Sequence, residues 1–389
     1  MSEWKLKDCC LSISDGDHLP PPKADSGIPF ITISNIDSTN HIDFGNTLFV
    51  SIDYYNKLDP IRKAKPNDII YSVVGSFGKP VLIKDNRKFV FQRHIAILRP
   101  NSEVVDSRFL YYVMLSRDFY MQADSVAIGA AQRTISLTSL RNMKVELPSL
   151  ANQINIADVL SRYDSLIENY QKQIKLLEEA AQRLYKEWFV DLRFPGHENT
   201  KIVNGVPEGW EKKRLIDLVD VQYGYAFDGK LFNNNGEGMP ILRIRNIPDG
   251  ITSDYTTEEA SPNYIVHDGD IVVGMDGIFH INSWNGGDAY LVQRACSFRP
   301  KEESTRGFIF QAIQEPIKYF EQTLVGATVA HLGKKHIDSI ELTVPANKDL
   351  YIPFQKGFKQ RQSLLSQIRL LTEARDRLLP KLMGGEIAV

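Results

Sequence analysis

The amino-acid sequence predicts an α+β protein in which two similar mixed α/β domains are separated by two long antiparallel coiled-coil helices, with pseudo-two-fold symmetry. Three observations lead to this prediction. The 389-residue chain repeats itself at a spacing of about 200 residues. The first part of each repeat alternates apolar and polar residues, as strands do. Each repeat then ends in a long segment with heptad spacing.

The internal repeat consists of five matching blocks, which occur in the same order in both halves. They are 27–36 with 238–247, 66–78 with 268–280, 91–100 with 292–300, 129–148 with 326–345, and 179–184 with 373–378. The third block is expected to place Gln92-Arg93 opposite Gln293-Arg294, and the fourth aligns without a gap. Five ordered blocks predict a duplicated unit of one domain followed by one helical segment.

Within each domain, alternating runs bounded by turn signals predict short strands. Examples are 28–36 and 89–98 in the first domain, and 240–247 and 271–273 in the second. Shorter helices are expected over 107–121 and 305–322.

The two long segments carry an apolar seam at heptad spacing, which is typical of paired helices. The first seam is Ile156, Leu160, Tyr163, Ile167, Tyr170, Ile174, Leu177, Ala181, Leu184 and Trp188. The second is Phe358, Leu364, Ile368, Leu371, Ala374, Leu378 and Leu382. Because each seam is the obvious partner of the other, we expect an antiparallel pair that holds two similar surfaces at a fixed separation.

These patterns divide the chain into five parts. We expect a first domain over 1–149, a first long helix over 150–192, a linker over 193–209, a second domain over 210–348 and a second long helix over 349–389.

Composition narrows the class of protein. Three cysteines without a CxxC pair argue against a disulfide scaffold or a cysteine zinc site and favour the cytoplasm. No apolar run long enough to span a membrane is expected. The net charge of −2 conceals an uneven distribution, since residues 57–144 carry 15 bases and 7 acids whereas residues 200–349 carry 15 bases and 21 acids. The first of these ranges is a candidate phosphate-facing surface.

Catalytic motifs are missing from the sequence. Residues 75–79 and 326–335 have the wrong glycine spacing for a phosphate-binding loop, and no GxGxxG follows a strand. His331 and His336 lack an HExxH pattern, so no metal site is expected. The sequence therefore predicts a binding protein or scaffold, not an enzyme.

The helix sequence LLEEAAQRLYKEWFVDLRFPG (176–196), the domain opening VPEGWEKKRL (206–215) and the end RLLPKLMGGEIAV (377–389) resemble the specificity subunits of type I restriction-modification systems. So do the Asn-Ile pairs at Asn35 and Asn246. The resemblance covers essentially the whole chain. The first domain departs from the pattern, because it keeps only Trp4, expected opposite Trp210, of the Pro-Glu-Gly-Trp opening.

The resemblance implies that each domain is a target recognition domain for one half of a bipartite, asymmetric site in double-stranded DNA. It implies that the helices fix the spacer between the halves and dock two modification (methyltransferase) subunits, which bind S-adenosylmethionine and methylate adenine. Restriction (motor-nuclease) subunits, which use ATP and Mg²⁺, would complete the complex. No cofactor is expected on this chain itself, and no membrane is expected as a partner.

To recognise DNA bases, a protein needs arginine, asparagine or glutamine side chains that reach the base edges in a groove. Contacts to phosphates need basic side chains, hydroxyl groups or backbone amides. The candidate DNA-binding residues in the first domain are Asn35, Arg93, Gln132, Arg133, Thr134 and Ser136. Those in the second are Arg243, Arg245, Asn246, Arg294, His331, Lys334 and Lys335. Arg243 and Arg245 are expected to share one face of a strand. Residues that differ between the domains are the better candidates for base reading.

Two other classes of function remain open. A coiled-coil scaffold could clamp two partner proteins without reading DNA, which the acidic second domain would suit. A nuclease or methyltransferase with an unrecognised site is the third. The candidate positions for partner docking or for the coiled coil itself are Ile156, Leu160, Tyr163, Ile167, Tyr170, Ile174, Leu177, Leu184, Trp188, Ile368, Leu371 and Leu378.

Overall fold

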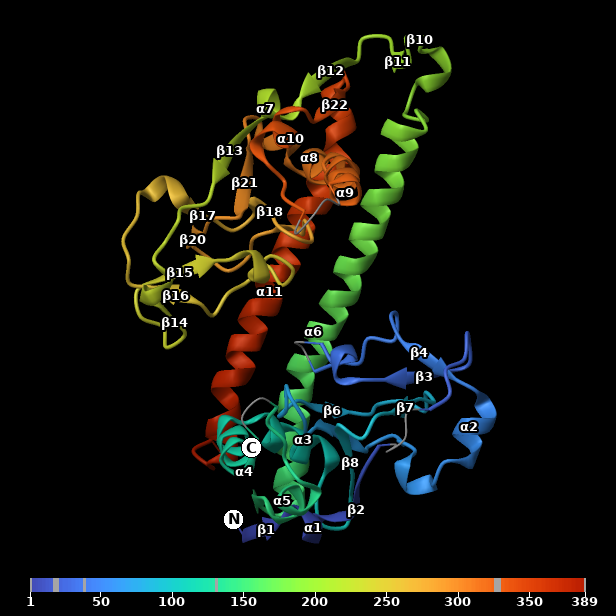
Figure 1. The fold of residues 1–389 in the computed structure, drawn as a ribbon, viewed down its shortest axis with the longest axis vertical. Helices are drawn as coiled ribbons and strands as arrows, with labels where there is room; N and C mark the ends of the chain where they lie inside the picture. Colours follow the sequence, from blue (N-terminus) through green and yellow to red (C-terminus); the bar gives the residue numbers. More distant parts are fainter. Residues whose placement is uncertain (1, 17–20, 38–39, 130–131, 325–329, 388–389) are drawn as a thin grey trace. The chain divides into compact units, whose positions relative to one another are not determined.

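The computed structural model describes residues 2–16, 21–37, 40–129, 132–324 and 330–387. The chain forms two compact units (Figure 1). Unit 1 combines residues 1–166 with 371–389, and unit 2 is residues 167–370. Each unit therefore contains one mixed domain and one end of each long helix.

Unit 1 contains a four-stranded antiparallel sheet in the order β2–β8–β5–β6. A second sheet has the order β4–β3–β7, in which β3 and β7 are parallel, and β1 pairs with β9. The strands are β1 (Ser2–Lys5), β2 (Cys10–Asp15), β3 (Ile28–Ile31), β4 (Leu48–Val50), β5 (Ile69–Ser72), β6 (Pro80–Leu82), β7 (Val90–Phe91), β8 (Ile95–Pro100) and β9 (Lys144–Leu147). The helices are α1 (Leu6–Cys9), α2 (Ile52–Lys57), α3 (Ser107–Leu115), α4 (Arg117–Val126) and α5 (Leu137–Asn142).

Strand β5 lies at the centre of unit 1 and is buried on both faces. Alternate residues of a strand point to opposite faces, so Ile69 and Tyr71 enter one core while Ile70 enters another. The first core also receives Phe109 from α3 and Phe119 from α4. This double burial explains why the strand reads as a continuous apolar run instead of a strict alternation.

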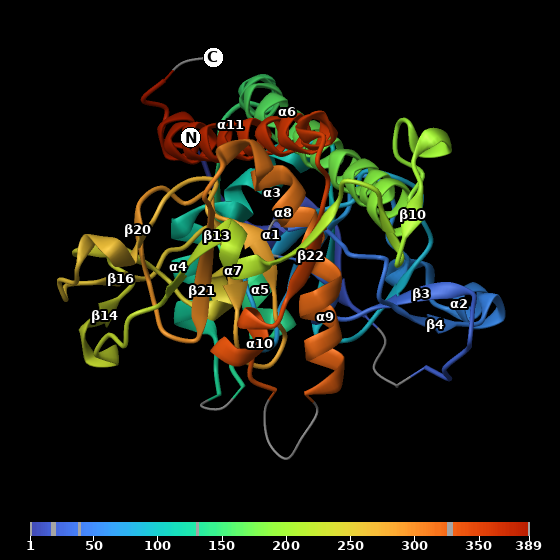
Figure 2. The same ribbon diagram turned by 90° about the horizontal axis from the view of Figure 1, so that it is seen from above.

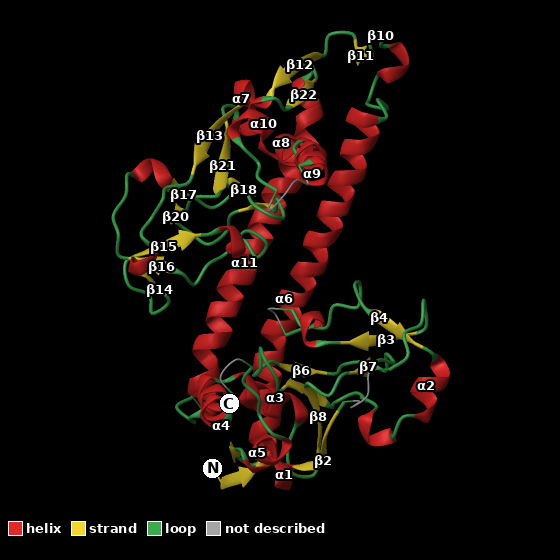
Figure 3. Ribbon diagram, in the orientation of Figure 1, coloured by secondary structure: helices red, strands yellow, loops and turns green. Residues whose placement is uncertain are grey.

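Unit 2 repeats this plan (Figures 1 and 3). Its four-stranded sheet is β13–β21–β18–β19, its second sheet is β14–β16–β15–β20–β17, and β12 pairs with β22. The strands are β10 (Ile202–Val203), β11 (Val206–Pro207), β12 (Glu211–Arg214), β13 (Val219–Tyr223), β14 (Phe232–Asn233), β15 (Met239–Leu242), β16 (Tyr255–Thr256), β17 (Ile265–Val266), β18 (Ile271–Gly274), β19 (Ile281–Ser283), β20 (Ala289–Leu291), β21 (Ala295–Pro300) and β22 (Glu341–Val344). The helices are α7 (Leu215–Leu218), α8 (Arg306–Ala312), α9 (Gln314–Thr323) and α10 (Lys334–Asp338).

The core of unit 2 joins β18, β21 and β22 to α8 and α9, and Figure 2 shows β22 passing beside α8. β15 and β20 are parallel, like β3 and β7 in unit 1. The predicted internal repeat is therefore confirmed at the level of strand order and direction.

The long helices are α6 (Leu150–Tyr185), which continues into a π-helical turn over Lys186–Val190, and α11 (Ile352–Met383). In unit 1, Leu160 of α6 packs in the same core as Leu379 and Leu382 of α11. Asp164 accepts a 2.8 Å hydrogen bond from Arg375. The two segments run antiparallel, because residues later in α6 contact residues earlier in α11.

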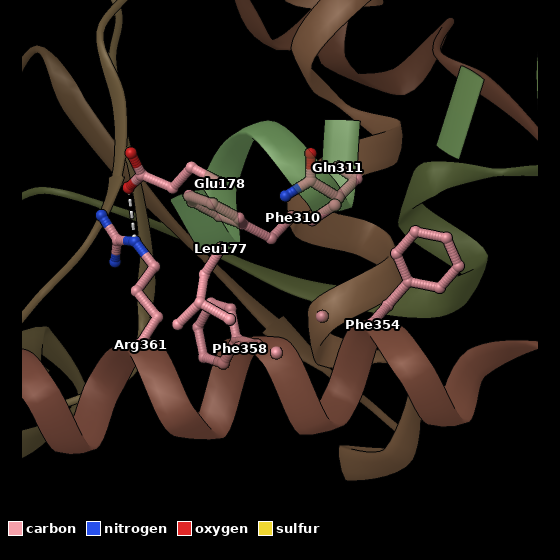
Figure 4. A pocket seen from close by; sticks show the side chains of 10 residues that line it. Leu177, Glu178, Phe310, Gln311, Phe354, Phe358 and Arg361 are labelled. Carbon is pink, nitrogen blue, oxygen red and sulfur yellow. Dashed lines mark hydrogen bonds and ion pairs between the residues drawn. The ribbon is translucent and has the colours of Figure 1, made fainter. Parts of the chain in front are cut away.

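The same direction holds within unit 2. Arg361 Nε donates to Glu178 at 2.6 Å (Figure 4), and further along α6 the Tyr185 ring lies 6.3 Å from the Phe354 ring. Leu177 of α6 and Phe358 of α11 line one pocket together with residues of α8. The predicted antiparallel pairing and heptad seam are confirmed, with Ile156, Leu160, Ile167 and Ile174 buried.

An aromatic cluster brings together two of the sequence segments on which the family resemblance rests, KEWFVDLRFPG and VPEGW. Phe189, in the π-helical turn, lies 5.2 Å from Trp210 and 4.9 Å from Phe308. Phe194 lies 4.6 Å from Trp210. The KEWFVDLRFPG and VPEGW segments therefore pack together at the entrance to the second domain.

Three local expectations were wrong. The segments 28–36 and 240–247 are strands only to Ile31 and Leu242, after which the chain turns into short 3₁₀ helices. The expected helices 107–121 and 305–322 are each broken into two, the first at Ser116, whose hydroxyl caps α4. Trp4 does not correspond to Trp210. In the matched strand pairs, Lys5 faces Lys144 and Arg214 faces Glu341, which places Trp4 at the position of Lys213.

A polar contact inside unit 1 generates a stability prediction. Asp164 has a side chain only 16% exposed and accepts from Arg375 and, at 2.6 Å, from the Tyr112 hydroxyl. Burial, followed by the negative charge of Asp164, raises the pKa of Tyr112 and keeps its hydroxyl protonated. Removing the carboxylate would leave the Tyr112 hydroxyl and the Nη1 group of Arg375 without this acceptor, while Arg375 would keep its contact with Asp376.

We expect Asp164→Ala to weaken the anchoring of residues 371–383 by about 2–3 kcal/mol. The measurement is amide hydrogen exchange in the full chain, in which these amides should lose protection. Asp376→Asn is the matched control, because Asp376 contacts the same Arg375 but is 57% exposed. Equal protection in wild type and Asp164→Ala would contradict this assignment.

Candidate nucleic-acid interface

Three loops of the first domain meet at the end of β5. They are residues 73–79 after β5, the turn 92–94 before β8 and residues 132–136 before α5, and we call their meeting point the three-loop junction. Val73 N–H donates to His94 O at 2.9 Å, Ile135 N–H donates to Val73 O at 2.8 Å, and Gly75 N–H donates to Arg133 O at 2.9 Å. Backbone hydrogen bonds therefore connect all three loops.

The second domain builds the same junction at the end of β18. Met275 N–H donates to Arg294 O at 2.9 Å, Leu332 N–H donates to Met275 O at 2.7 Å, and Gly277 N–H donates to Ala330 O at 2.9 Å. One residue beyond Val73 and Met275, Val74 bridges to Thr134 and Asp276 bridges to His331. Each bond of one domain has its counterpart in the other.

This correspondence corrects one alignment from the sequence. Gln92 N–H donates to Ile31 O and Val292 N–H donates to Leu242 O, so Gln92 corresponds to Val292. The following turn has the same length in both domains, and Arg294 therefore lies opposite His94. The expected match of Gln92-Arg93 with Gln293-Arg294 was wrong by one residue.

The block 129–148 aligns with 326–345 without a gap wherever the structure describes both. The strands β9 and β22 and the starts of α5 and α10 keep one constant offset. Residues 130–131 and 326–329 of these blocks lie outside the described residues.

In the second domain, the junction gathers a carboxylate and two cationic or titratable side chains. Asp276, with a side chain 13% exposed, accepts from His331 Nδ1 at 2.5 Å and from Arg294 Nη1. Burial acts to raise the pKa of Asp276, but the hydrogen bonds from His331 and Arg294 outweigh it and the pKa is lowered. The carboxylate is therefore charged and holds two outward-facing side chains, since Arg294 is 68% and His331 59% exposed.

Arg294 itself has a left-handed backbone, with φ of 69°. A non-glycine residue in this region is uncommon, and such residues gather at functional sites. Lys334 and Lys335 are exposed at the start of α10, which follows the same loop.

In the first domain, a carboxylate and an aromatic ring together hold the arginine of the junction, Arg133. Arg133 pairs with Asp124 and lies 5.4 Å above the Phe77 ring, which is stacked 5.8 Å from Tyr120. Gln132 is exposed beside it, and its amide nitrogen lies near Gly75. Arg93 is exposed in the turn before β8.

Two candidates in this loop have structural contacts of their own. Thr134 exchanges backbone hydrogen bonds with Ile128, and Ser136 caps α5 by accepting from Ser139 N–H at 2.9 Å. Gly333 occupies the corresponding cap position of α10.

Asn35 and Asn246 have matching structural roles. Asn35 Oδ1 accepts from Thr32 N–H at 2.9 Å, and Asn246 Oδ1 accepts from Arg243 N–H at 2.9 Å. Each asparagine closes a 3₁₀ turn directly after a parallel strand. These side-chain bonds explain why the predicted strands end early.

The expected strand face with Arg243 and Arg245 is therefore absent from this described segment. Arg243 precedes the 3₁₀ turn and lies 5.2 Å from the Phe232 ring, whereas Arg245 lies within it and pairs with Asp254 at 2.6 Å. The turn lies beside the junction, because a Cβ atom on Gly274 would come within 3.0 Å of Ile244 Cγ1. The two arginines thus lie near the junction but do not form one reading face.

Sequence reasoning missed the two carboxylates that hold the arginines, Asp124 and Asp276. A signal existed for Asp276, because the gap-free match of 66–78 with 268–280 places it opposite the apolar Val74. No comparable signal marks Asp124, whose contact with Arg133 depends on how α4 packs.

The described residues contain no group of three or more His, Cys, Asp or Glu side chains arranged to hold a metal ion. Across the same residues, none of the helices has the length and apolar character that crossing a membrane requires.

Comparison with known proteins identifies the family. The type I restriction modification DNA specificity domain matches residues 3–179 and 207–365. The type I restriction enzyme MjaIX specificity subunit of Methanocaldococcus jannaschii is 27% identical over 308 residues, covering 75% of this chain and 71% of the relative. The HindI specificity subunit of Haemophilus influenzae is 24% identical over 473 aligned positions, covering all of both chains.

A crystal structure of the type I restriction-modification S subunit from M. genitalium covers 98% of this chain and 95% of its own, with a TM-score of 0.54 at 18% identity. That likeness concerns the fold. The two segments matched by the family model span most of the sequence, and the chain belongs to the family of type I restriction-modification DNA specificity subunits.

Proposed function

We propose that each mixed domain reads one half of a bipartite, asymmetric site in duplex DNA, with its three-loop junction facing the bases. The observation that carries this proposal is the repeated junction, in which identical backbone bonds hold different side chains. A shared scaffold gives both domains the same docking geometry, and different side chains give different base preferences.

The second domain offers guanidinium and imidazole donors at its junction. Arg294 contacts Asp276 through Nη1, so the carboxylate fixes one end of the fork while the side chain stays 68% exposed. An arginine fork held in this way suits the O6 and N7 acceptors of guanine in the major groove. Lys334 and Lys335 would add phosphate contacts that position the domain.

The first domain offers a further basic surface within residues 57–144. Lys63 and Lys88 lie 5.1 Å and 5.7 Å from the Tyr55 ring, and Arg87 lies 4.3 Å from the Phe44 ring. Cations spread over aromatic faces keep their charge available to the DNA backbone. We infer that the first domain contributes more of the salt-dependent affinity than the acidic second domain.

We further propose that this chain supplies no catalytic group and that its partners perform the chemistry. Two modification subunits carrying S-adenosylmethionine would methylate adenine, and restriction subunits using ATP and Mg²⁺ would cleave. Apolar side chains on the long helices support docking there, since Leu166, Leu176 and Leu370 are 45%, 64% and 60% exposed. We also expect the complex to act in the cytoplasm, where chromosomal DNA is found.

A second candidate is a scaffold that clamps two proteins without reading DNA. The excess of acids in residues 200–349 favours it. The two functions differ in whether DNA sequence affects binding.

The decisive experiment is selection from duplexes with two randomised half-sites by the chain assembled with its modification subunits. We expect enrichment of two fixed sequences separated by a spacer of constant length. We also expect affinity to fall steeply with salt, because phosphate contacts release counterions. Binding with no sequence preference would overturn the recognition proposal and favour the scaffold.

The roles of two exposed cations can be separated on the selected site. We expect Arg294→Ala to cost about 5- to 150-fold in affinity and to relax one base position, as losing a bidentate base contact does. Lys335→Ala should weaken binding to all sequences alike and lower the salt slope by about one. If Arg294→Ala left every base preference unchanged, Arg294 would not read a base.

The length of the long helices should set the spacer. We expect insertion of four residues, about one helical turn, near residues 165–175 to change the preferred spacer while both half-site sequences stay the same. The same selection measures both quantities. An inserted chain that selected altered half-sites with the old spacer would refute this role of the helices.

A further inference from the structure

The loop after the central strand carries the same pattern in both domains, with one position that differs. Residues 75–77 read Gly-Ser-Phe, and residues 277–279 read Gly-Ile-Phe. Both glycines have left-handed backbones, with φ of 69° and 70°. Both donate their N–H to the third loop of the junction, Gly75 to Arg133 O and Gly277 to Ala330 O.

The phenylalanines also have similar roles. Phe279 is 4% exposed and packs in the core of unit 2, and Phe77 packs against the core of unit 1. Glycine and phenylalanine therefore shape and anchor the loop. The residue between them, Ser76 or Ile278, is left exposed at its tip.

Ile278 is 60% exposed although its neighbours on both sides are fixed. Gly277 is held by its bond to Ala330, and Phe279 N–H donates to Glu321 at 2.7 Å. His280 N–H donates to Ile278 O at 3.0 Å. The isoleucine is thus displayed on a loop whose backbone is already ordered, so binding through it costs little conformational entropy.

The surroundings of Ile278 indicate what it contacts. Two residues before it, Asp276 holds Arg294 and His331, both of which are more than half exposed. A single exposed apolar residue is common on protein surfaces. Here it lies among the groups proposed to face DNA, where the apolar feature of a base edge is the C5-methyl group of thymine.

We propose that Ile278 is a specificity-determining residue that contacts the C5-methyl group of one thymine in the half-site read by the second domain. This inference rests on the proposed function. Ser76 presents a hydroxyl at the matched place in the first domain, and a hydroxyl hydrogen-bonds to base edges and lacks preference for the methyl group. The pair would therefore help the two domains read different sequences from one scaffold.

The test uses the full chain assembled with its modification subunits, bound to the duplex selected from the randomised library. Each thymine in turn is replaced by deoxyuridine, which pairs with adenine but lacks the methyl group. We expect wild type to lose about fourfold in affinity at one thymine of one half-site, the amount that corresponds to about 0.8 kcal/mol for one buried aliphatic carbon (CH₂) group. Ile278→Ala should bind the thymine and uracil duplexes equally at that position.

Ser76→Ala is the matched control, and it should leave the uracil effect at that thymine unchanged. Ile278→Val should retain part of the effect, which guards against a variant that merely misfolds. The inference is overturned if no thymine is selected in that half-site, if the uracil effect persists in Ile278→Ala, or if Ile278→Ala weakens all duplexes alike, as a wedge between base pairs would. Failure to select any sequence would instead overturn the proposed function.

Discussion

Three backbone hydrogen bonds in each domain join the loop after the central strand to two loops that are distant in sequence, and the rest of the candidate interface depends on them. Because these bonds use only N–H and C=O groups, they leave exposed positions such as Ser76 and Ile278 free to differ between the domains. The strands from which the loops emerge, β5 and β18, are buried on both faces, so the close-packed core opposes their displacement. A rigid frame with freely varying side chains is what a recognition domain needs.

The side chains on the two frames are held by different means. In the first domain, Asp124 and the Phe77–Tyr120 stack position Arg133. In the second, one largely buried carboxylate, Asp276, positions both Arg294 and His331. Ordering a long side chain before it meets its ligand removes part of the entropy cost of binding. This difference also suggests why the charge of the chain is uneven. The basic first domain suits strong contact with the DNA phosphates, and the acidic second domain suits contact through a few localised cations.

The sequence predicted the large features well because they depend on periodicity. Heptad spacing identified both long helices and their buried positions, such as Leu160 and Ile174, and the ordered blocks identified the duplicated sheets. The errors came from interactions that periodicity does not encode. The amide oxygens of Asn35 and Asn246 bond to backbone N–H groups three residues earlier and end two predicted strands. The one-residue error at Gln92 arose because both turns contain a Gln-Arg pair, but the pair in the second domain begins one residue later in the turn than the pair in the first.

The candidate site was only partly predictable for a related reason. Exposed cations such as Arg294 and Lys334 could be chosen from the sequence, because loops next to duplicated blocks were evident. Their anchors could not, since the contact of Asp124 with Arg133 and that of Asp276 with His331 exist only after the loops have been brought together. Ser136 shows the converse, because a hydroxyl chosen for binding DNA also serves as a helix cap.

Site-specific photocrosslinking tests the central claim most directly. A photoreactive amino acid would be placed at position 132 in the first domain, or at position 334 in the second, and the chain with its modification subunits would be bound to the selected duplex. If each domain contacts one half-site through its three-loop junction, position 132 should crosslink to nucleotides of one half-site and position 334 to nucleotides of the other. Crosslinks from both positions to the same half-site, or only to the spacer, would contradict the account.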